Sequence, residues 1–231
     1  MLPFKNLSLS LKLLHFKPTA FFSYENVNLS HALSLFFSKE FVLENNHVKL
    51  VSMKDSHISA LRPVLLDQSL WTYNPSFLCS NEEDLKNYID KALEQKQSKK
   101  RFPFVIFRTS DNKCTGTSSF YNVSFEHQTA CIGYTIIGKE FQKTGINQNS
   151  KYLMLKHAFE ELKMKRVEFN LETLNQHSVV SLLKMGIKQE GILRSNILTR
   201  TGRRRDTTVL SLLDDEWPKV KERLEKKLNK N

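Results

Sequence analysis

The spacing of hydrophobic and polar residues along the chain predicts an alternation of strands and helices. Three segments rich in β-branched and aromatic residues, 102–108, 115–123 and 130–137, are predicted strands, and a polar turn joins the first two as a hairpin. After the third strand, apolar residues recur at the spacing of one helix face, at Tyr152, Leu155, Phe159 and Leu162. We therefore expect a strand, a tight turn and a helix in this region, with Asn147 as the helix N-cap.

Weaker patterns precede this central unit. Residues 47–53 alternate as a short strand. Two helices are predicted next, one capped by Asp55 and one beginning at a capping box in residues 80–83.

Further elements follow the central helix. Residues 167–173 alternate strictly, which predicts a strand with one polar face, and Gly186 ends a short helix over 178–185. Two strands are then expected at 187–193 and 207–213. A terminal helix follows, with one apolar side formed by Val220, Leu224 and Leu228.

The turn before the central helix has the features of an anion site. It consists of Gln142, Lys143, Thr144, Gly145, Ile146 and Asn147. Free N–H groups at a helix start and the positive end of the helix dipole attract anions, and Gly145 lets a phosphate approach the backbone. Lys143 adds a positive charge. The same residues also fit an ordinary connection between a strand and a helix, so the downstream sequence must decide between the two interpretations.

Composition places the chain among globular proteins. Its 231 residues are 40% hydrophobic and 26% charged, enough for one substantial core. No apolar run approaches the roughly 20 residues that span a bilayer, so no membrane segment is expected. Cys79, Cys114 and Cys131 form an odd set without C-x-x-C spacing, which indicates reduced thiols in an intracellular, cytoplasmic setting and predicts no metal site.

A net charge of +11 suits an anionic partner. The excess gathers in residues 96–101, 200–205 and 219–230, where no aromatic residues are interleaved to stack on bases. This placement disfavours a nucleic-acid module and leaves a polyanionic cofactor as the simpler partner.

Residues 1–40 differ from the remainder, 41–231, and form an N-terminal extension. No acidic residue occurs before Glu25, as in an organelle transit peptide, although such peptides carry Arg and none occurs before Arg62. The alternative is an extension whose second half, residues 29–37, packs on the domain or on a partner. Both interpretations stay open.

The order of elements and several short motifs resemble the GNAT superfamily of acetyl-CoA-dependent N-acetyltransferases. Within this superfamily, the chain resembles the branch that includes the ribosomal-protein N-terminal acetyltransferases. The resemblance covers about residues 42–228. Its motifs are Ile132-Gly133-Tyr134-Thr135, Gln142-Lys143-Thr144-Gly145-Ile146-Asn147, His157-Ala158-Phe159-Glu160, Arg166-Val167-Glu168, Asn175-Gln176-His177-Ser178, Glu190-Gly191-Ile192-Leu193-Arg194, Arg205-Asp206 and Asp215-Glu216-Trp217. It implies an α/β fold with a mixed, mostly antiparallel twisted sheet, flanking helices and a C-terminal helix.

The resemblance also implies roles for individual residues. The turn 142–147 would bind the CoA pyrophosphate, although Asn147 stands where the family has Gly or Ala. Main-chain groups of Tyr134, Thr135 and Ile136 would pair with the pantetheine arm, and Asn175 would contact it through its side chain. The Ser178 hydroxyl would protonate the leaving thiolate, or else serve only as a helix cap. The implied acceptor is a protein N-terminus, with a small-molecule amine, or a non-catalytic ribosome- or RNA-binding role, as alternatives.

A general base is hard to assign from the sequence. Relatives often have a carboxylate before the Ile-Gly-Tyr motif, and this chain has Cys131. Glu168 and Glu172 on the polar face of the next strand are candidates, although such a face is commonly just solvated. His157 and His177 are expected at the surface. A water chain, or an amine that arrives neutral, would serve instead. The sequence does not indicate which oligomeric state the protein adopts.

Overall fold

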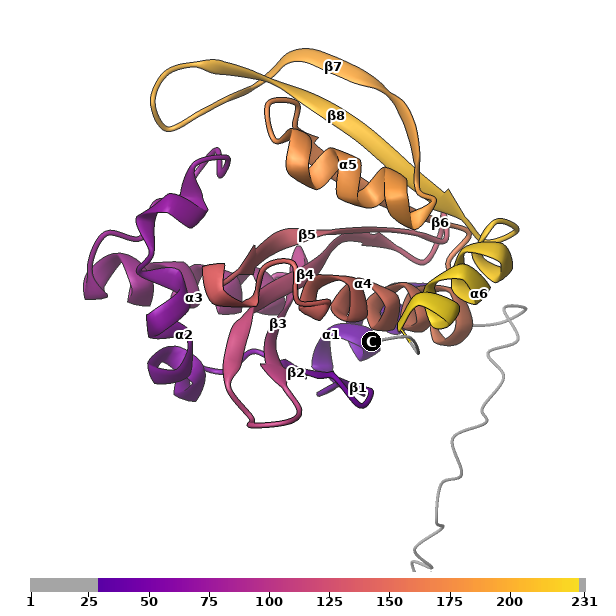
Figure 1. Cartoon of the computed structure of the whole chain (residues 1–231), viewed down its shortest axis with the longest axis horizontal. Coiled ribbons are helices and arrows are strands. Elements are labelled where there is room, and N and C mark those ends of the chain that lie inside the picture. Colours follow the sequence, from indigo (N-terminus) through magenta and orange to yellow (C-terminus); the bar gives the residue numbers. More distant parts are fainter. Residues whose placement is uncertain (1–28, 229–231) are drawn as a thin grey trace, which may run out of the picture.

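The computed structural model describes residues 29–228 and shows a mixed α/β fold (Figure 1). Eight strands form one sheet in the order β1-β2-β3-β4-β5-β6-β8-β7, antiparallel throughout except between β5 and β6. The strands are β1 (Val42–Glu44), β2 (Val48–Ser52), β3 (Arg101–Arg108), β4 (Cys114–Ser124), β5 (Thr129–Ile137), β6 (Arg166–Glu172), β7 (Lys188–Leu198) and β8 (Arg204–Leu213). The helices are α1 (Leu29–Ser38), α2 (Ile58–Leu65), α3 (Glu82–Gln97), α4 (Ile146–Lys156), α5 (Gln176–Met185) and α6 (Trp217–Leu228). The expected mixed, mostly antiparallel sheet with flanking helices and a C-terminal helix is confirmed.

The sheet separates two hydrophobic cores. Successive side chains of a strand point to opposite faces, and β3 shows this directly. Phe104 and Ile106 pack with residues of α4 and α6, whereas Val105 between them packs with residues of α2 and α3. Helices on both faces therefore bury the central strands, which is why β3 is apolar at nearly every position.

Helix α1 belongs to the first of these cores. Phe36 and Phe37 are buried, and the Phe36 ring lies 5.0 Å from that of Phe102 on β3. The interpretation that residues 29–37 pack on the domain is confirmed by these contacts. The transit-peptide interpretation concerns mainly residues that lie outside the described part of the chain.

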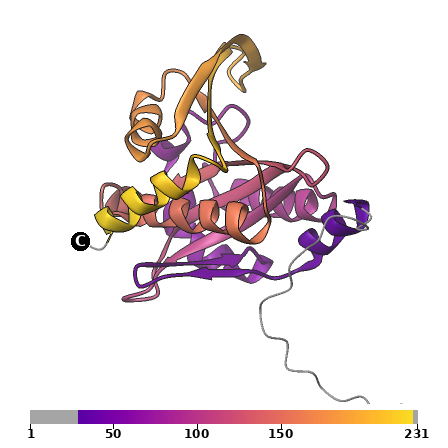
Figure 2. The ribbon, with the colours of Figure 1, turned by 90° about the vertical axis from the view of Figure 1, so that its right-hand side faces the viewer.

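The C-terminal elements stand apart from the other layers. Figure 2 shows α5 and the β7–β8 hairpin rising above the rest of the sheet, while α6 lies along α4. β6 joins the two parts, because it pairs with β5 on one side and with β8 on the other.

The first two predicted helix caps were wrong. Asp55 does not cap α2, whose N-cap is His57, and the N-cap of α3 is Asn81, whose side chain accepts a hydrogen bond from the Asp84 N–H, so residues 80–83 do not form the predicted capping box.

Two later helix starts also differ from the sequence prediction. The N-cap of α4 is Gly145, whose φ of +88° is natural for glycine, and Asn147 lies inside the first turn. The N-cap of α5 is Asn175, whose Oδ1 accepts a hydrogen bond from the Ser178 N–H at 3.2 Å. The capping interpretation of Ser178 was therefore wrong, since this residue lies within the first turn.

Candidate active site

β5 and β6 run parallel but separate after a short contact. They pair only where Thr129–Cys131 faces residues 166–168. Beyond Cys131, β5 stays paired with β4, and β6 continues along β8. The strands therefore diverge, and the edge of β5 that carries residues 134–136 is left without a neighbouring strand. Unpaired backbone groups along such an edge can bind an extended ligand as an added strand.

A bulge shapes β5 at this opening. Tyr134 has a φ of +52°, and the register shifts so that Tyr134 and Thr135 together face Ser118 on β4. The Ser118 and Thr135 hydroxyl oxygens lie 2.8 Å apart. A positive φ is unusual for a bulky aromatic residue, and such strain is characteristic of functional sites.

The turn after β5 presents an array of free N–H groups. Side-chain bonds fix the loop, since Gln142 Nε2 donates to the Ile137 carbonyl at 3.1 Å and the Thr144 hydroxyl donates to the Phe141 carbonyl at 2.7 Å. The backbone N–H groups of residues 143–148 have no hydrogen-bond acceptor within the described chain. Lys143 and Gly145 both have positive φ, an alternation that curls successive N–H groups into an anion-binding concavity.

Asn175 and Ser178 follow β6 at the same end of the sheet as this turn. The carboxyl ends of parallel strands meet at one edge, so the segments after β5 and β6 flank the opening together. The Asn175 N–H donates to the Glu172 carbonyl at 2.9 Å, which fixes the residue against the strand end. The half-buried Ser178 makes no hydrogen bond through its hydroxyl to any described residue, so that group is available to a ligand.

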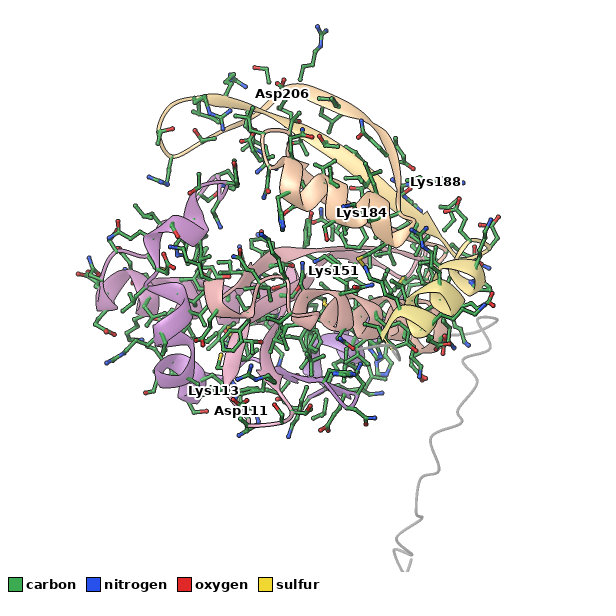
Figure 3. All side chains as sticks on the ribbon, viewed as in Figure 1. Asp111, Lys113, Lys151, Lys184, Lys188 and Asp206 are labelled. Atoms are coloured by element: carbon green, nitrogen blue, oxygen red, sulfur yellow. The ribbon has the colours of Figure 1, made fainter. Side chains whose placement is uncertain are left out.

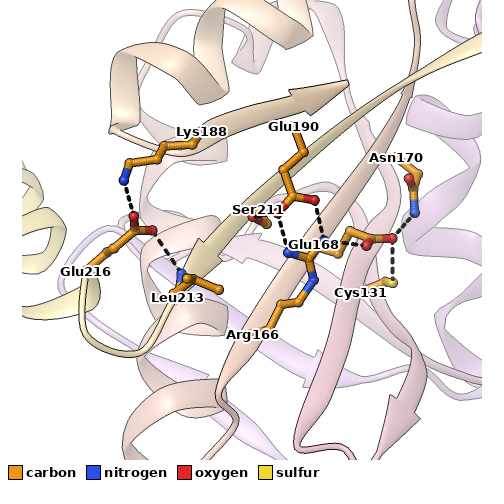
Figure 4. A network of polar contacts seen from close by, with 9 residues as sticks. All are labelled: Cys131, Arg166, Glu168, Asn170, Lys188, Glu190, Ser211, Leu213 and Glu216. Atoms are coloured by element: carbon orange, nitrogen blue, oxygen red, sulfur yellow. Dashed lines mark hydrogen bonds and ion pairs between the residues drawn. The ribbon is translucent and has the colours of Figure 1, made fainter. Parts of the chain in front are cut away.

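A polar network lies at the point where the strands separate (Figure 4). Glu168 Oε1 accepts from Asn170 Nδ2 at 2.6 Å and lies 3.7 Å from Cys131 Sγ, and Arg166 donates to Glu168 Oε2 at 2.8 Å. Arg166 also pairs with Glu190, and its guanidinium lowers the pKa of Glu190 to about 2. Burial and the nearby Glu168 charge raise the pKa of Cys131 to about 12, so this residue stays a thiol.

Comparison with known proteins assigns the chain to a family. Residues 47–188 match the family model described as an acetyltransferase (GNAT) domain. The chain belongs to the GNAT acetyltransferase family. "Probable N-acetyltransferase YjcK" of Bacillus subtilis (strain 168) is 34% identical over 137 residues, which are 58% of this chain and 75% of the relative.

Solved structures agree with the observed fold. A GCN5-related N-acetyltransferase from Brucella melitensis matches with a TM-score of 0.75 at 21% identity, over 81% of this chain and 85% of its own. The ribosomal-protein-S5-alanine acetyltransferase from Vibrio fischeri matches with a TM-score of 0.63 at 20% identity. The match covers 77% of this chain and 98% of the Vibrio fischeri chain. The expectation of a GNAT acyltransferase is confirmed.

GNAT domains use acetyl-CoA, and the opening of this GNAT domain suits such a cosubstrate. The free N–H groups of residues 143–148 match a diphosphate in charge and hydrogen bonding, and the exposed edge of β5 matches the amides of a pantetheine arm. In the described residues, no group of three or more His, Cys, Asp or Glu is placed to hold a metal ion. Nor does the described part contain a helix long and apolar enough to cross a membrane.

Glu168 and Glu172, the two carboxylates considered as general bases, both form ion pairs with arginine side chains. Glu168 is held by Arg166 and Asn170, as described above. Glu172 is buried, and its Oε2 accepts from the Arg203 guanidinium at 2.5 Å. Each of these carboxylates therefore already has an arginine as its ion-pair partner.

Glu172 also lines a cavity of about 80 Å³ together with residues 72–75, residues 199–201 and Arg203. Two of the segments that line this cavity are joined directly, since the Arg200 N–H donates to the Pro75 carbonyl at 2.7 Å. Glu172 Oε1 has no hydrogen-bond donor among the described residues. The cavity therefore combines a buried acceptor atom with walls that a backbone hydrogen bond holds together.

The two histidines behave differently. His177 is exposed on α5, as expected. His157 was expected at the surface, and that prediction was wrong, because the residue is buried with its ring 4.9 Å from that of Phe41. Burial lowers the pKa of His157 to about 4, so the imidazole is neutral in the fold.

Sequence analysis missed two buried cations near the opening, Arg101 on β3 and Lys151 on α4. Arg101 ends a basic run that begins at Lys99, and Lys151 follows four polar residues, so the sequence offered no signal that either side chain is buried. In a sequence, a charged residue within an amphipathic pattern is usually assigned to the solvent side.

Proposed function

We propose that the protein transfers the acetyl group of acetyl-CoA to a primary amine, with a protein N-terminus as the acceptor. The observation that carries the proposal is the array of unpaired N–H groups at residues 143–148, directly beside the divergence of β5 and β6. An extended thioester cosubstrate with a diphosphate needs both features, and they lie at one end of the sheet.

The residues divide between binding and chemistry. Gln142, Lys143, Thr144, Gly145, Ile146 and Asn147 would bind the diphosphate, mainly through the backbone. Tyr134, Thr135 and Ile136 would hold the pantetheine arm through main-chain groups, with Asn175 contacting it from the other side. A backbone N–H of the β5 bulge would polarise the thioester carbonyl.

Acetyl transfer requires two proton movements. The amine nitrogen attacks the thioester carbonyl carbon, the new C–N bond replaces the C–S bond, and the thiolate takes up a proton while the amine loses one. The Ser178 hydroxyl is free to donate to the thiolate. Because Glu168 and Glu172 are both held by arginines, we infer that the amine arrives neutral or loses its proton to water.

Two observations favour a protein N-terminus. The chain shares its fold with an enzyme named as a ribosomal-protein-S5-alanine acetyltransferase. The hydrogen bond from Arg200 to the Pro75 carbonyl joins two segments that line the cavity beside Glu172, and joined walls leave less room for a chain that must continue on both sides than for a chain end. The small size of the same cavity, about 80 Å³, favours a small-molecule amine as the second candidate.

An acceptor panel tests the proposal. Release of the CoA thiol and the mass of the product are measured with peptides that have free N-termini, with the same peptides N-terminally blocked but containing lysine, and with small amines. We expect acetylation of the free N-termini only. Turnover restricted to small amines would replace the acceptor, and salt-sensitive RNA binding without thioester turnover would support a non-catalytic role.

A further inference from the structure

Lys151 is a buried cation without a counter-ion. It lies in the second turn of α4 and is only 7% exposed. Its ammonium donates to Asn147 Oδ1 at 3.1 Å, and none of the described carboxylates forms an ion pair with it. An ammonium can donate three hydrogen bonds, so two of its donors lack an acceptor in the described chain. Burying such a charge costs free energy unless a partner compensates it.

The position of Lys151 indicates which partner this is. Its Nζ lies 5.9 Å from the centre of the Phe169 ring, and Phe169 is the first residue of β6 beyond the contact with β5. Asn147, its acceptor, belongs to the turn with the free N–H groups. Figure 3 shows Lys151 on the side of α4 that faces α5. The ammonium thus lies between the turn and the opening.

We propose that Lys151 is a phosphate-binding residue, which places the second positive charge of the site against the CoA diphosphate. The inference rests on the proposed function. The Asn147 side chain accepts a hydrogen bond from the ammonium one turn further along the helix, while the Asn147 backbone N–H stays free. Burial lowers the pKa of Lys151 to about 8, and a bound dianion would restore the charged form. The lysine therefore destabilises the ligand-free protein and strengthens binding of the cosubstrate.

This double effect gives the test. Lys151→Met retains an unbranched apolar stem and removes the charge, and Lys156→Met removes an exposed charge from the same helix as a control. Calorimetry with CoA should show affinity reduced about tenfold to a hundredfold in Lys151→Met, as for a lost charge-assisted hydrogen bond, and little changed in Lys156→Met. Without ligand, Lys151→Met should melt at a higher temperature than the wild type. If Lys151 only maintained the fold, its substitution would lower both the CoA affinity and the melting temperature of the ligand-free protein.

Shortened ligands locate the contact. Dephospho-CoA lacks the 3′-phosphate but keeps the diphosphate, so its affinity should fall in Lys151→Met as the affinity of CoA does. S-acetylpantetheine lacks the diphosphate and should bind the wild type and Lys151→Met with equal affinity. Loss of the effect with dephospho-CoA would overturn the assignment to the diphosphate. Lys151→Leu repeats the measurement if the Met variant does not fold.

The two proposals can fail separately. Equal CoA affinity in the wild type and in a folded Lys151→Met would overturn this inference alone. Absence of CoA binding to the wild type would overturn the proposed function, and this inference with it.

Discussion

The guanidinium of Arg101 lies 3.9 Å from the centre of the Tyr134 ring. Arg101 is almost fully buried, donates to the Ser119 hydroxyl at 2.8 Å and to the Tyr88 hydroxyl at 2.7 Å, and leaves Nη1 without a partner in the described residues. The cation–π contact stabilises Tyr134 in its strained backbone conformation. A residue on β3 thereby supports the bulge that faces the opening.

Arg101→Lys should therefore weaken both the fold and catalysis. Lysine lacks the planar fork that bonds two hydroxyls while stacking on a ring, so we expect a loss of about 1–3 kcal/mol in the free energy of unfolding. Relaxation of the bulge should also lower kcat with the acceptor. Denaturant unfolding and steady-state kinetics measure these effects. Tyr134→Phe keeps the ring and serves as the control, and wild-type behaviour of a folded Arg101→Lys would contradict the supporting role.

Gly145→Asp should weaken CoA binding at least tenfold. Its carboxylate would compete with phosphate for the N–H groups of the turn, while a Cβ at this position meets only Asn149 Nδ2, at 3.6 Å, so the fold has room for it. Gly202→Asp is the matched control, since Gly202 also has a positive φ, of +80°, and open space around it. Calorimetry on both variants separates backbone strain from loss of the site. Equal CoA affinities for the two would remove the turn from the binding site.

Substitution of Ser178 and of Asn175 should have separable effects. Ser178→Ala should lower kcat roughly 10²-fold, at the low end for general acid catalysis because water can partly replace a hydroxyl, with little change in melting temperature. Asn175→Ala removes the N-cap of α5 and should cost about 1 kcal/mol of stability. Thermal melts and kinetics on the same preparations compare them. Retention of wild-type kcat by Ser178→Ala, with a confirmed acceptor, would assign thiolate protonation to solvent.

His157 should make the fold acid-sensitive. Its pKa in the fold is about 4, below its ordinary value of 6.5, so the unfolded chain binds the proton more tightly. Stability from this residue is complete above pH 6.5 and is lost as the pH falls towards 4, by an amount on the order of 3 kcal/mol. Urea unfolding between pH 7 and pH 4 should show a smaller loss for His157→Leu than for the wild type. His177→Leu, which changes an exposed histidine, should follow the wild type.

The sequence was sufficient to predict most strands and the order of elements, because their periodic patterns reflect burial on one or both faces. Residue contacts across the sheet were not predictable in this way. Asn147 is a good capping residue by type, but the φ of Gly145 moved the cap two residues earlier. His157 is buried because aromatic residues from β4 and from the segment after α1 converge on it. Glu168 forms an ion pair with Arg166, two residues away on the same strand face, and this pairing was not predicted.

The short contact between β5 and β6 makes the sheet a structure of two halves. Three residue pairs join β1–β5 to the β6–β8–β7 half, whereas β6 and β8 are joined by seven. Apart from the edge pair β1–β2, which also has three residue pairs, this is the shortest pairing in the sheet, and the proposed cosubstrate would lie along it. A ligand that bonds to β5, to the turn before α4 and to the start of α5 would connect the two halves of the sheet. Binding of the cosubstrate should therefore make the whole molecule more rigid.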